Sequence, residues 1–288
     1  MNLVAPLRSL YVALALVIGF GLTAASILSM LDLVQVSISG LSYLDGPALF
    51  SFSSDGYTPV VGAIALVSGM AALRRRWQAL AVACWFLLGT GVIDALSVVW
   101  LLAEQGAIPN SVGGTFIAIW LSFPILGLLL AAKAGSRDEP KSDGPAQVVA
   151  QDKIRLRNTL VGLAVISYFW RVATLALSPG ATLALSYLRG TTEVYLVLGC
   201  VVGVGAAVLL LVAIVLSRKH GDRFMTAALA FSAGFAFEGF LDAIDIMLGT
   251  AVNLEIAYAL QDVVAFAASC AALALSERRA KRMAPQVT

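Results

Sequence analysis

The sequence has 288 residues, of which 60% are hydrophobic and 12% charged, and its mean hydropathy is +0.90. Soluble domains carry about 25% charged residues, so this composition excludes an ordinary water-soluble fold and predicts an integral membrane protein. The formal net charge is only +2. We expect the lipid bilayer as a partner, and no nucleic acid.

Eight apolar stretches follow one another along the chain, and most reach the ~20 residues that a helix needs to cross the hydrocarbon layer. We place Pro59 in the first turn of the second stretch, and we expect Pro124 to kink the fourth. The first is interpreted as a retained span rather than a cleaved signal peptide. The stretches are roughly 9–31, 57–73, 78–102, 113–133, 159–177, 194–217, 225–247 and 254–275.

The second half of the chain repeats the first. Residues 91–95 (GVIDA) return as 239–243 (GFLDA), and Arg8 aligns with Arg157. Four spans bring a chain back to the side where it started, so both copies enter the membrane from the same side. We therefore expect an all-α integral membrane fold of eight transmembrane helices, arranged as two parallel four-helix repeats. The expected boundaries are 1–134 and 157–276 for the repeats, 135–156 for a cytoplasmic linker and 277–288 for a basic cytoplasmic tail.

Basic residues define the orientation. With the N-terminus inside, all of the 19 lysines and arginines except Arg171 and Arg189 fall on the cytoplasmic side. Positively charged loops stay in the cytoplasm. We therefore expect a protein of the plasma (inner) membrane with both termini cytoplasmic.

Side chains that hold cofactors are scarce. The chain has three cysteines without paired spacing, and its one histidine, His220, lies in a basic segment. These numbers argue against zinc, iron–sulfur and bis-histidine haem sites. Lys133 is the last residue of the fourth apolar stretch, and no lysine lies further inside any of them, which excludes a retinal Schiff base. We expect no cofactor and no metal, and we interpret the cysteines as packing residues.

Acidic residues gather on one face of the seventh stretch. Spacings of four and three place Glu238, Asp242 and Asp245 on the same side of a helix. The first copy is less acidic in this place, and its aligned residues are Thr90, Asp94 and Ser97.

These acids share their depth with a base. At 1.5 Å per residue, Glu238 lies about 22 Å along its helix from Arg223, and Arg171 lies about 21 Å from Arg157. Asp262 reaches a similar depth from the outer side. A charge at mid-span costs about 2.5–3.5 kcal/mol, so these residues should pair or line water, and we expect Arg171 to pair with Glu238.

Three interpretations of this set stay open. It is an ion-pair network that joins the two halves, or an acidic intramembrane cavity that opens to the outside and binds a cation, a proton or a cationic solute. In the third, Asp245 and Asp262 simply reach the outer interface and are solvated. One arginine cannot neutralise three carboxylates, so we expect at least one acid to hold a proton. The candidate substrate- or ion-binding residues are Asp94, Glu238, Asp242, Asp245, Arg171, Asp262 and Thr90.

Three classes of function fit these features. The first is a transporter or channel for a small cation, a proton or a cationic solute. The alternative is a non-catalytic, haem-free subunit of a multi-subunit membrane complex, with other membrane subunits or copies of itself as partners. Two four-helix halves without haem ligands resemble the architecture of quinone-contacting anchor subunits, and this implies quinone contact and proton relay. A lipid-modifying enzyme is the third class, and because paired carboxylates alone are a thin reason for it, we lean towards a protein that is not an enzyme.

Two minor features also predict contacts. Gly199 and Gly203, four residues apart, favour a close approach of two helices. Tyr11 lies near the inner end of the first stretch, where tyrosines are common at the level of the lipid headgroups.

Overall fold

The computed structural model describes residues 4–30, 57–105, 111–138, 151–177, 191–220, 222–248 and 256–282. Every regular element in these ranges is an α-helix, which confirms the expected all-α class. The helices are α1 (Val4–Met30), α2 (Tyr57–Leu73), α3 (Trp77–Gln105), α4 (Ser111–Asp138), α5 (Gln151–Leu177), α7 (Thr191–His220), α8 (Arg223–Leu248) and α9 (Ile256–Arg282).

Each predicted apolar stretch lies in one of these helices, beyond which it extends by two residues at most. Pro59 lies in the first turn of α2, and α4 continues through Pro124 as one helix. The helices also run beyond the apolar stretches, because polar residues such as lysine, arginine and glutamine are good helix formers. As a result α4 ends at Asp138 and α5 begins at Gln151, so both extend into the predicted linker.

Two of the described helices contain a segment long and apolar enough to cross a membrane. These segments are 4–24 in α1 and 199–217 in α7. Shorter apolar segments occur in α2, α3, α4, α8 and α9.

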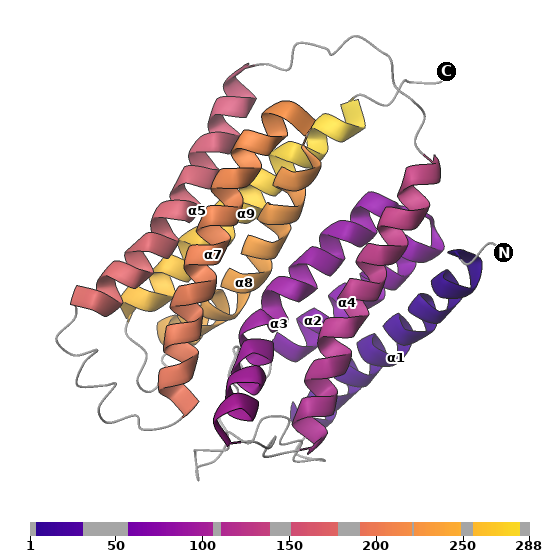
Figure 1. Ribbon diagram of the computed structural model, residues 1–288, viewed down its shortest axis with the longest axis horizontal. Coiled ribbons are helices and arrows are strands. Elements are labelled where there is room, and N and C mark those ends of the chain that lie inside the picture. Colours follow the sequence, from indigo (N-terminus) through magenta and orange to yellow (C-terminus); the bar gives the residue numbers. More distant parts are fainter. Residues whose placement is uncertain are drawn as a thin grey trace.

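The helices form two groups that lie side by side (Figure 1). The first bundle consists of α1–α4, and the second bundle consists of α5 and α7–α9. The helices pack in the same order in both bundles. In the first bundle, α1 and α3 each pack on α2 and α4. In the second bundle, α5 and α8 each pack on α7 and α9. In Figure 1, α1 and α5 both begin at the upper-right end of their bundles, where α4 and α9 end.

Alanine is the most frequent buried residue in both cores, where it packs beside larger side chains such as Tyr11 and Tyr168. Alanines fill the space between the helices, including Ala15, Ala72, Ala164, Ala236 and Ala272, all within the two core clusters. In contrast, Val17, Phe20, Leu129, Ile166 and Trp170 are each more than half exposed. Large apolar side chains therefore lie both in the cores and on the outer surface of the bundles.

The two bundles meet where α3 crosses α8. A Cβ atom added to Gly234 would collide with the carbonyl oxygen of Phe86, and one added to Gly89 would collide with that of Phe231. The backbones of α3 and α8 therefore touch directly. Close by, the rings of Phe86 and Phe237 pack at 5.7 Å between centroids.

Candidate functional site

A buried ion pair lies within the second bundle. Nη1 of Arg171 on α5 donates to both carboxylate oxygens of Asp262 on α9, each at 3.1 Å. The two side chains are 18% and 7% exposed. A charged pair so far from water requires close geometry, because the cost of removing both ions from water opposes their attraction.

Two other helices leave room for this pair. On α7, a Cβ atom at Gly199 would lie 3.2 Å from Nη2 of Arg171. On α8, the ring of Phe235 lies under the guanidinium at 5.9 Å, within the range of a cation–π contact. Also on α8, a Cβ atom at Gly239 would collide with the carboxylate of Asp262. All four helices of the second bundle therefore shape the site.

Arg171 and Asp262 were both predicted from their depth, but the predicted partner of Arg171 was Glu238. The side chains of Glu238, Asp242 and Asp245 lie outside the described residues, so contacts between these acids and Arg171 stay predictions. Their helix is placed: Gly239, next to Glu238, packs directly on Asp262. The acidic face of α8 is thus carried by the segment that passes the ion pair.

The first repeat contributes α3 to this region. Val92 and Leu96 pack against the core of the second bundle, so the segment that carries Asp94 lies between the bundles, although the side chain of Asp94 itself is outside the described residues. Thr90 is buried, and its hydroxyl donates to the carbonyl oxygen of Leu87 at 2.8 Å. The predicted outward-facing cavity would be formed partly by residues 31–56 and 178–190, which also lie outside the described residues.

A chain of hydroxyl groups lies one turn from the ion pair, and the sequence analysis missed it. The hydroxyl of Tyr168 on α5 contacts Ser232 Oγ at 2.8 Å and donates to the Ser232 carbonyl oxygen at 2.9 Å. Ser232 Oγ lies 2.8 Å from Ser269 Oγ on α9. The sequence signal that could have revealed it is the seven-residue spacing of Asp262, Ser269 and Ser276, which puts three polar residues on one face of α9. All three are buried.

The first bundle has a buried polar cluster of its own around Tyr11. The hydroxyl of Tyr11 lies 2.8 Å from Ser68 Oγ and 3.2 Å from Cys84 Sγ, and its ring stacks on Phe123 at 4.8 Å. The expectation that Tyr11 lies at the headgroup level is wrong, because its side chain points into the bundle and is fully buried. Leu22, which aligns with Arg171, is also buried.

Gly199 and Gly203 of α7 make room for side chains of neighbouring helices and do not mark a close contact between helix backbones. Gly199 leaves space for Arg171, and Gly203 lies against the rings of Tyr168 and Phe235. Direct backbone contact occurs instead at Gly89 and Gly234, which the sequence analysis did not single out.

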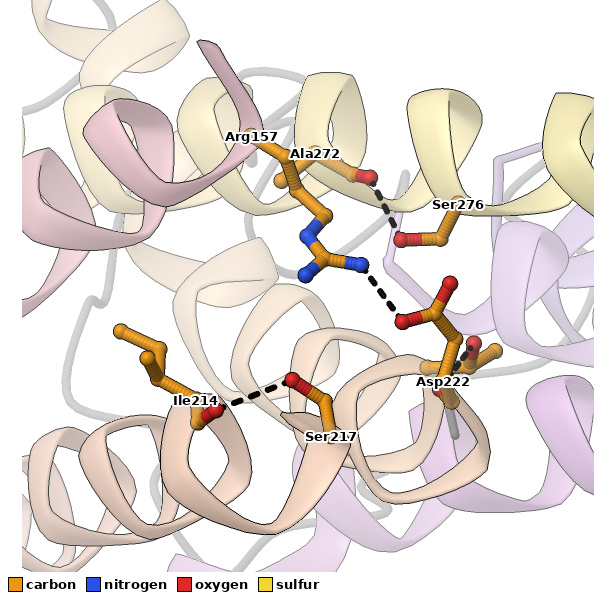
Figure 2. Close-up of polar contacts among 7 residues, drawn as sticks. Arg157, Ile214, Ser217, Asp222, Ala272 and Ser276 are labelled. Atoms are coloured by element: carbon orange, nitrogen blue, oxygen red, sulfur yellow. Dashed lines mark hydrogen bonds and ion pairs between the residues drawn. The ribbon is translucent and has the colours of Figure 1, made fainter. Parts of the chain in front are cut away.

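A second ion pair stabilises the opposite end of the same bundle (Figure 2). Arg157 Nη1 on α5 donates to Asp222 Oδ1 at 2.7 Å, and Arg157 is 6% exposed. Asp222 also caps α8, because its carbonyl oxygen accepts from the backbone N–H and the hydroxyl of Thr226. This pair fixes the connection between α7 and α8 onto α5.

The arrangement can hold charge inside an apolar bundle. Within the described ranges, no three side chains of the types that bind metals come together. Arg171 and Asp262 instead provide one positive and one negative group beside the α8 segment that carries three further acids. No family model matches the chain, and neither a curated protein nor a solved structure matches it.

Proposed function

We propose that the chain is an integral membrane protein that crosses the plasma membrane eight times, with both termini in the cytoplasm. The exposed aliphatic shell around alanine-, serine- and glycine-rich cores supports this proposal, because lipid can solvate large apolar side chains and small residues let helices pack closely. The asymmetric distribution of lysine and arginine supports the orientation.

The two bundles are parallel repeats related by a rotation about the membrane normal. Alignment of Gly91 with Gly239 also aligns Phe86 with Gly234, and Gly89 with Phe237. If each residue is replaced by its aligned partner in the other repeat, the contact of Gly89 with Gly234 becomes the contact of Phe237 with Phe86. Both contacts are present. A two-fold relation has this property, because each contact across its axis occurs twice.

The protein binds a proton or a small cation at an acidic site in the outer half of the second bundle, and it works as a transporter or channel. The observation that carries this proposal is the buried pair of Arg171 and Asp262 beside Gly239. This pair joins α5 to α9 within one bundle. Charged groups kept inside a membrane bundle are characteristic of an ion or proton path.

Flux through the purified protein tests the proposal. Proteoliposomes are loaded with a pH-sensitive dye, or with a dye for Na⁺ or K⁺. A gradient of the matching ion (H⁺, Na⁺ or K⁺) is then applied across the membrane in either direction. We expect flux from the parent protein and at least a tenfold loss for Asp262→Asn. The matched control is Asp222→Asn, which removes a carboxylate from the ion pair at the other end of the bundle and should retain flux.

The outcome also separates this function from the alternative. If the pure protein carries no flux with any of these gradients, and gentle extraction from membranes retrieves stoichiometric partner subunits, the chain is a non-catalytic subunit of a membrane complex. Equal flux from the parent and Asp262→Asn would remove the acidic site from the mechanism.

A further inference from the structure

The turn between α2 and α3 consists of three arginines in a rigid cap. The N–H of Arg76 donates to the carbonyl oxygen of Ala71 at 2.8 Å, and the N–H of Arg75 donates to that of Ala72 at 3.2 Å. These are the two bonds of a Schellman motif, in which the residue after the helix takes the left-handed conformation. Arg75 occupies that position with φ of 55°.

Glycine is the preferred residue at such a position, because a Cβ atom destabilises the left-handed conformation. Arginine at this position therefore costs stability. Its neighbours Arg74 and Arg76 are also exposed. A strained residue that places one more positive charge in a fixed turn suggests that the turn recognises negative charge.

The corresponding turn of the second bundle is different. There Asp222 neutralises Arg157 in the buried pair described above. In the first bundle Arg8, which aligns with Arg157, lies in the early turns of α1. This end of α1 lies at the same end of the bundle as the turn between α2 and α3 (Figure 1). Within the described part of the chain, Arg8 and these three arginines form no ion pair with an acidic residue.

Groups suited to a lipid surround the turn. Trp77 follows Arg76 directly and packs against Gly135 of α4, where a Cβ atom would lie 3.6 Å away. Lys133 is exposed on the same end of α4. Below the arginines, Leu10 on α1 is 51% exposed and Leu73 on α2 is 62% exposed. The surface therefore changes from apolar to basic within one helical turn.

We propose that this turn, Arg74–Arg76 with Arg8 and Lys133 beside it, binds the phosphate headgroup of an acidic phospholipid in the cytoplasmic leaflet. The guanidinium fork matches phosphate oxygens, and the tryptophan suits the headgroup level. The exposed leucines continue the site towards the acyl chains, which favours a membrane lipid over a soluble phosphate. The inference rests on the membrane orientation in the proposed function, but not on ion transport.

Lipid titration of the full-length protein in detergent provides the test. Phosphatidylglycerol and phosphatidylcholine with identical acyl chains are added, and the bound lipid is counted by native mass spectrometry. We expect phosphatidylglycerol to bind preferentially. Each arginine near an anionic surface contributes about fivefold in affinity, so Arg74→Gln/Arg76→Gln should bind phosphatidylglycerol roughly 25-fold more weakly.

The matched control is Lys153→Gln/Arg155→Gln, which removes two exposed charges from the same end of the second bundle and should change the affinity less than twofold. Arg75→Gly separates folding from binding: it should raise the melting temperature in phosphatidylcholine and still weaken the binding of phosphatidylglycerol. An equal loss in both double variants, or no preference between the lipids, would overturn the proposal. Competition by millimolar inorganic phosphate would also overturn it, in favour of a soluble anion.

The candidate ion site can be tested separately on the same preparations. Arg171→Leu should leave the preference for phosphatidylglycerol unchanged even where flux is lost, because Arg171 is far along α5 from this end. A preference that persists in a protein without any flux would uphold the lipid site and reject transport alone.

Discussion

Asp262 of α9 lies directly against the backbone of α8 at Gly239, in a space that any side chain at that position would fill. The carboxylate is thereby held between this glycine and the guanidinium of Arg171. The ion pair thus depends on a residue without charge, and the absence of a Cβ atom on α8 is as necessary to it as the arginine.

Gly239→Ala should therefore disrupt the ion pair. The added methyl group forces Asp262 away from Arg171, and overpacking of this kind costs roughly 1–3 kcal/mol. Unfolding in mixed micelles measures the loss. Gly205→Ala is the control, because nothing lies within 4 Å of its Cβ position, and there alanine should stabilise the helix by up to about 1 kcal/mol. Equal effects of the two substitutions would contradict the packing at Gly239.

Arg171→Leu should be the most destabilising single substitution in the second bundle. Removal of one partner strands the other charge in an apolar interior, at a cost of about 3–5 kcal/mol. The double variant Arg171→Leu/Asp262→Asn should recover most of that loss, because no buried charge is left. The same unfolding assay decides: a double variant as unstable as Arg171→Leu would mean that Arg171 stabilises the bundle through groups other than Asp262.

Tyr168→Phe removes the hydroxyl that links α5 to Ser232. Interhelical hydrogen bonds in membrane bundles are worth roughly 0.6 kcal/mol on average and at most about 1.7 kcal/mol. We expect a loss in this range, since Ser232 and Ser269 still bond to each other. Tyr11→Phe is the matched variant of the first bundle and should lose a similar amount. No measurable loss in either variant would show that the ring, not the hydroxyl, carries the contact.

The helices and the shared level of Arg171 and Asp262 along the bundle could be predicted from the sequence, but the contact between these two residues could not. Apolar runs of about 20 residues and the positions of the arginines determine how far along its helix Arg171 lies. They do not determine the direction in which its side chain points around the bundle. Glu238 and Asp262 share that depth, and the path of α9 past Gly239 decides that Asp262 contacts Arg171. Tyr11 was misassigned for the same reason, because its position near a helix end says nothing about which face it occupies.

The proposed orientation in the membrane predicts a specific pattern of chemical accessibility. Cysteine placed at Ser142, in the predicted cytoplasmic linker, should react with a membrane-impermeant maleimide only after the cells are opened. Cysteine placed at Ser39, in a predicted outer loop, should react in intact cells. The three native cysteines are first replaced by alanine, and total labelling in detergent controls for reactivity. Labelling of both positions from the same side would contradict the topology and the depth argument that depends on it.

The contact of α3 with α8 predicts that the two bundles can assemble from separate chains. Each bundle has its own core, and the helices that join them meet at Gly234 and Gly89 without space for a Cβ atom. Residues 1–142 and 143–288, expressed together as two chains, should therefore purify as a complex through a tag on one of them. Gly234→Leu should abolish this association, because the leucine would have to displace the backbone of α3 at Phe86.

Gly162→Leu is the control, since the Cβ position of Gly162 has no neighbour within 4 Å, and it should leave the complex intact. Recovery of a stable complex with Gly234→Leu would place the junction between the bundles elsewhere than at this crossing.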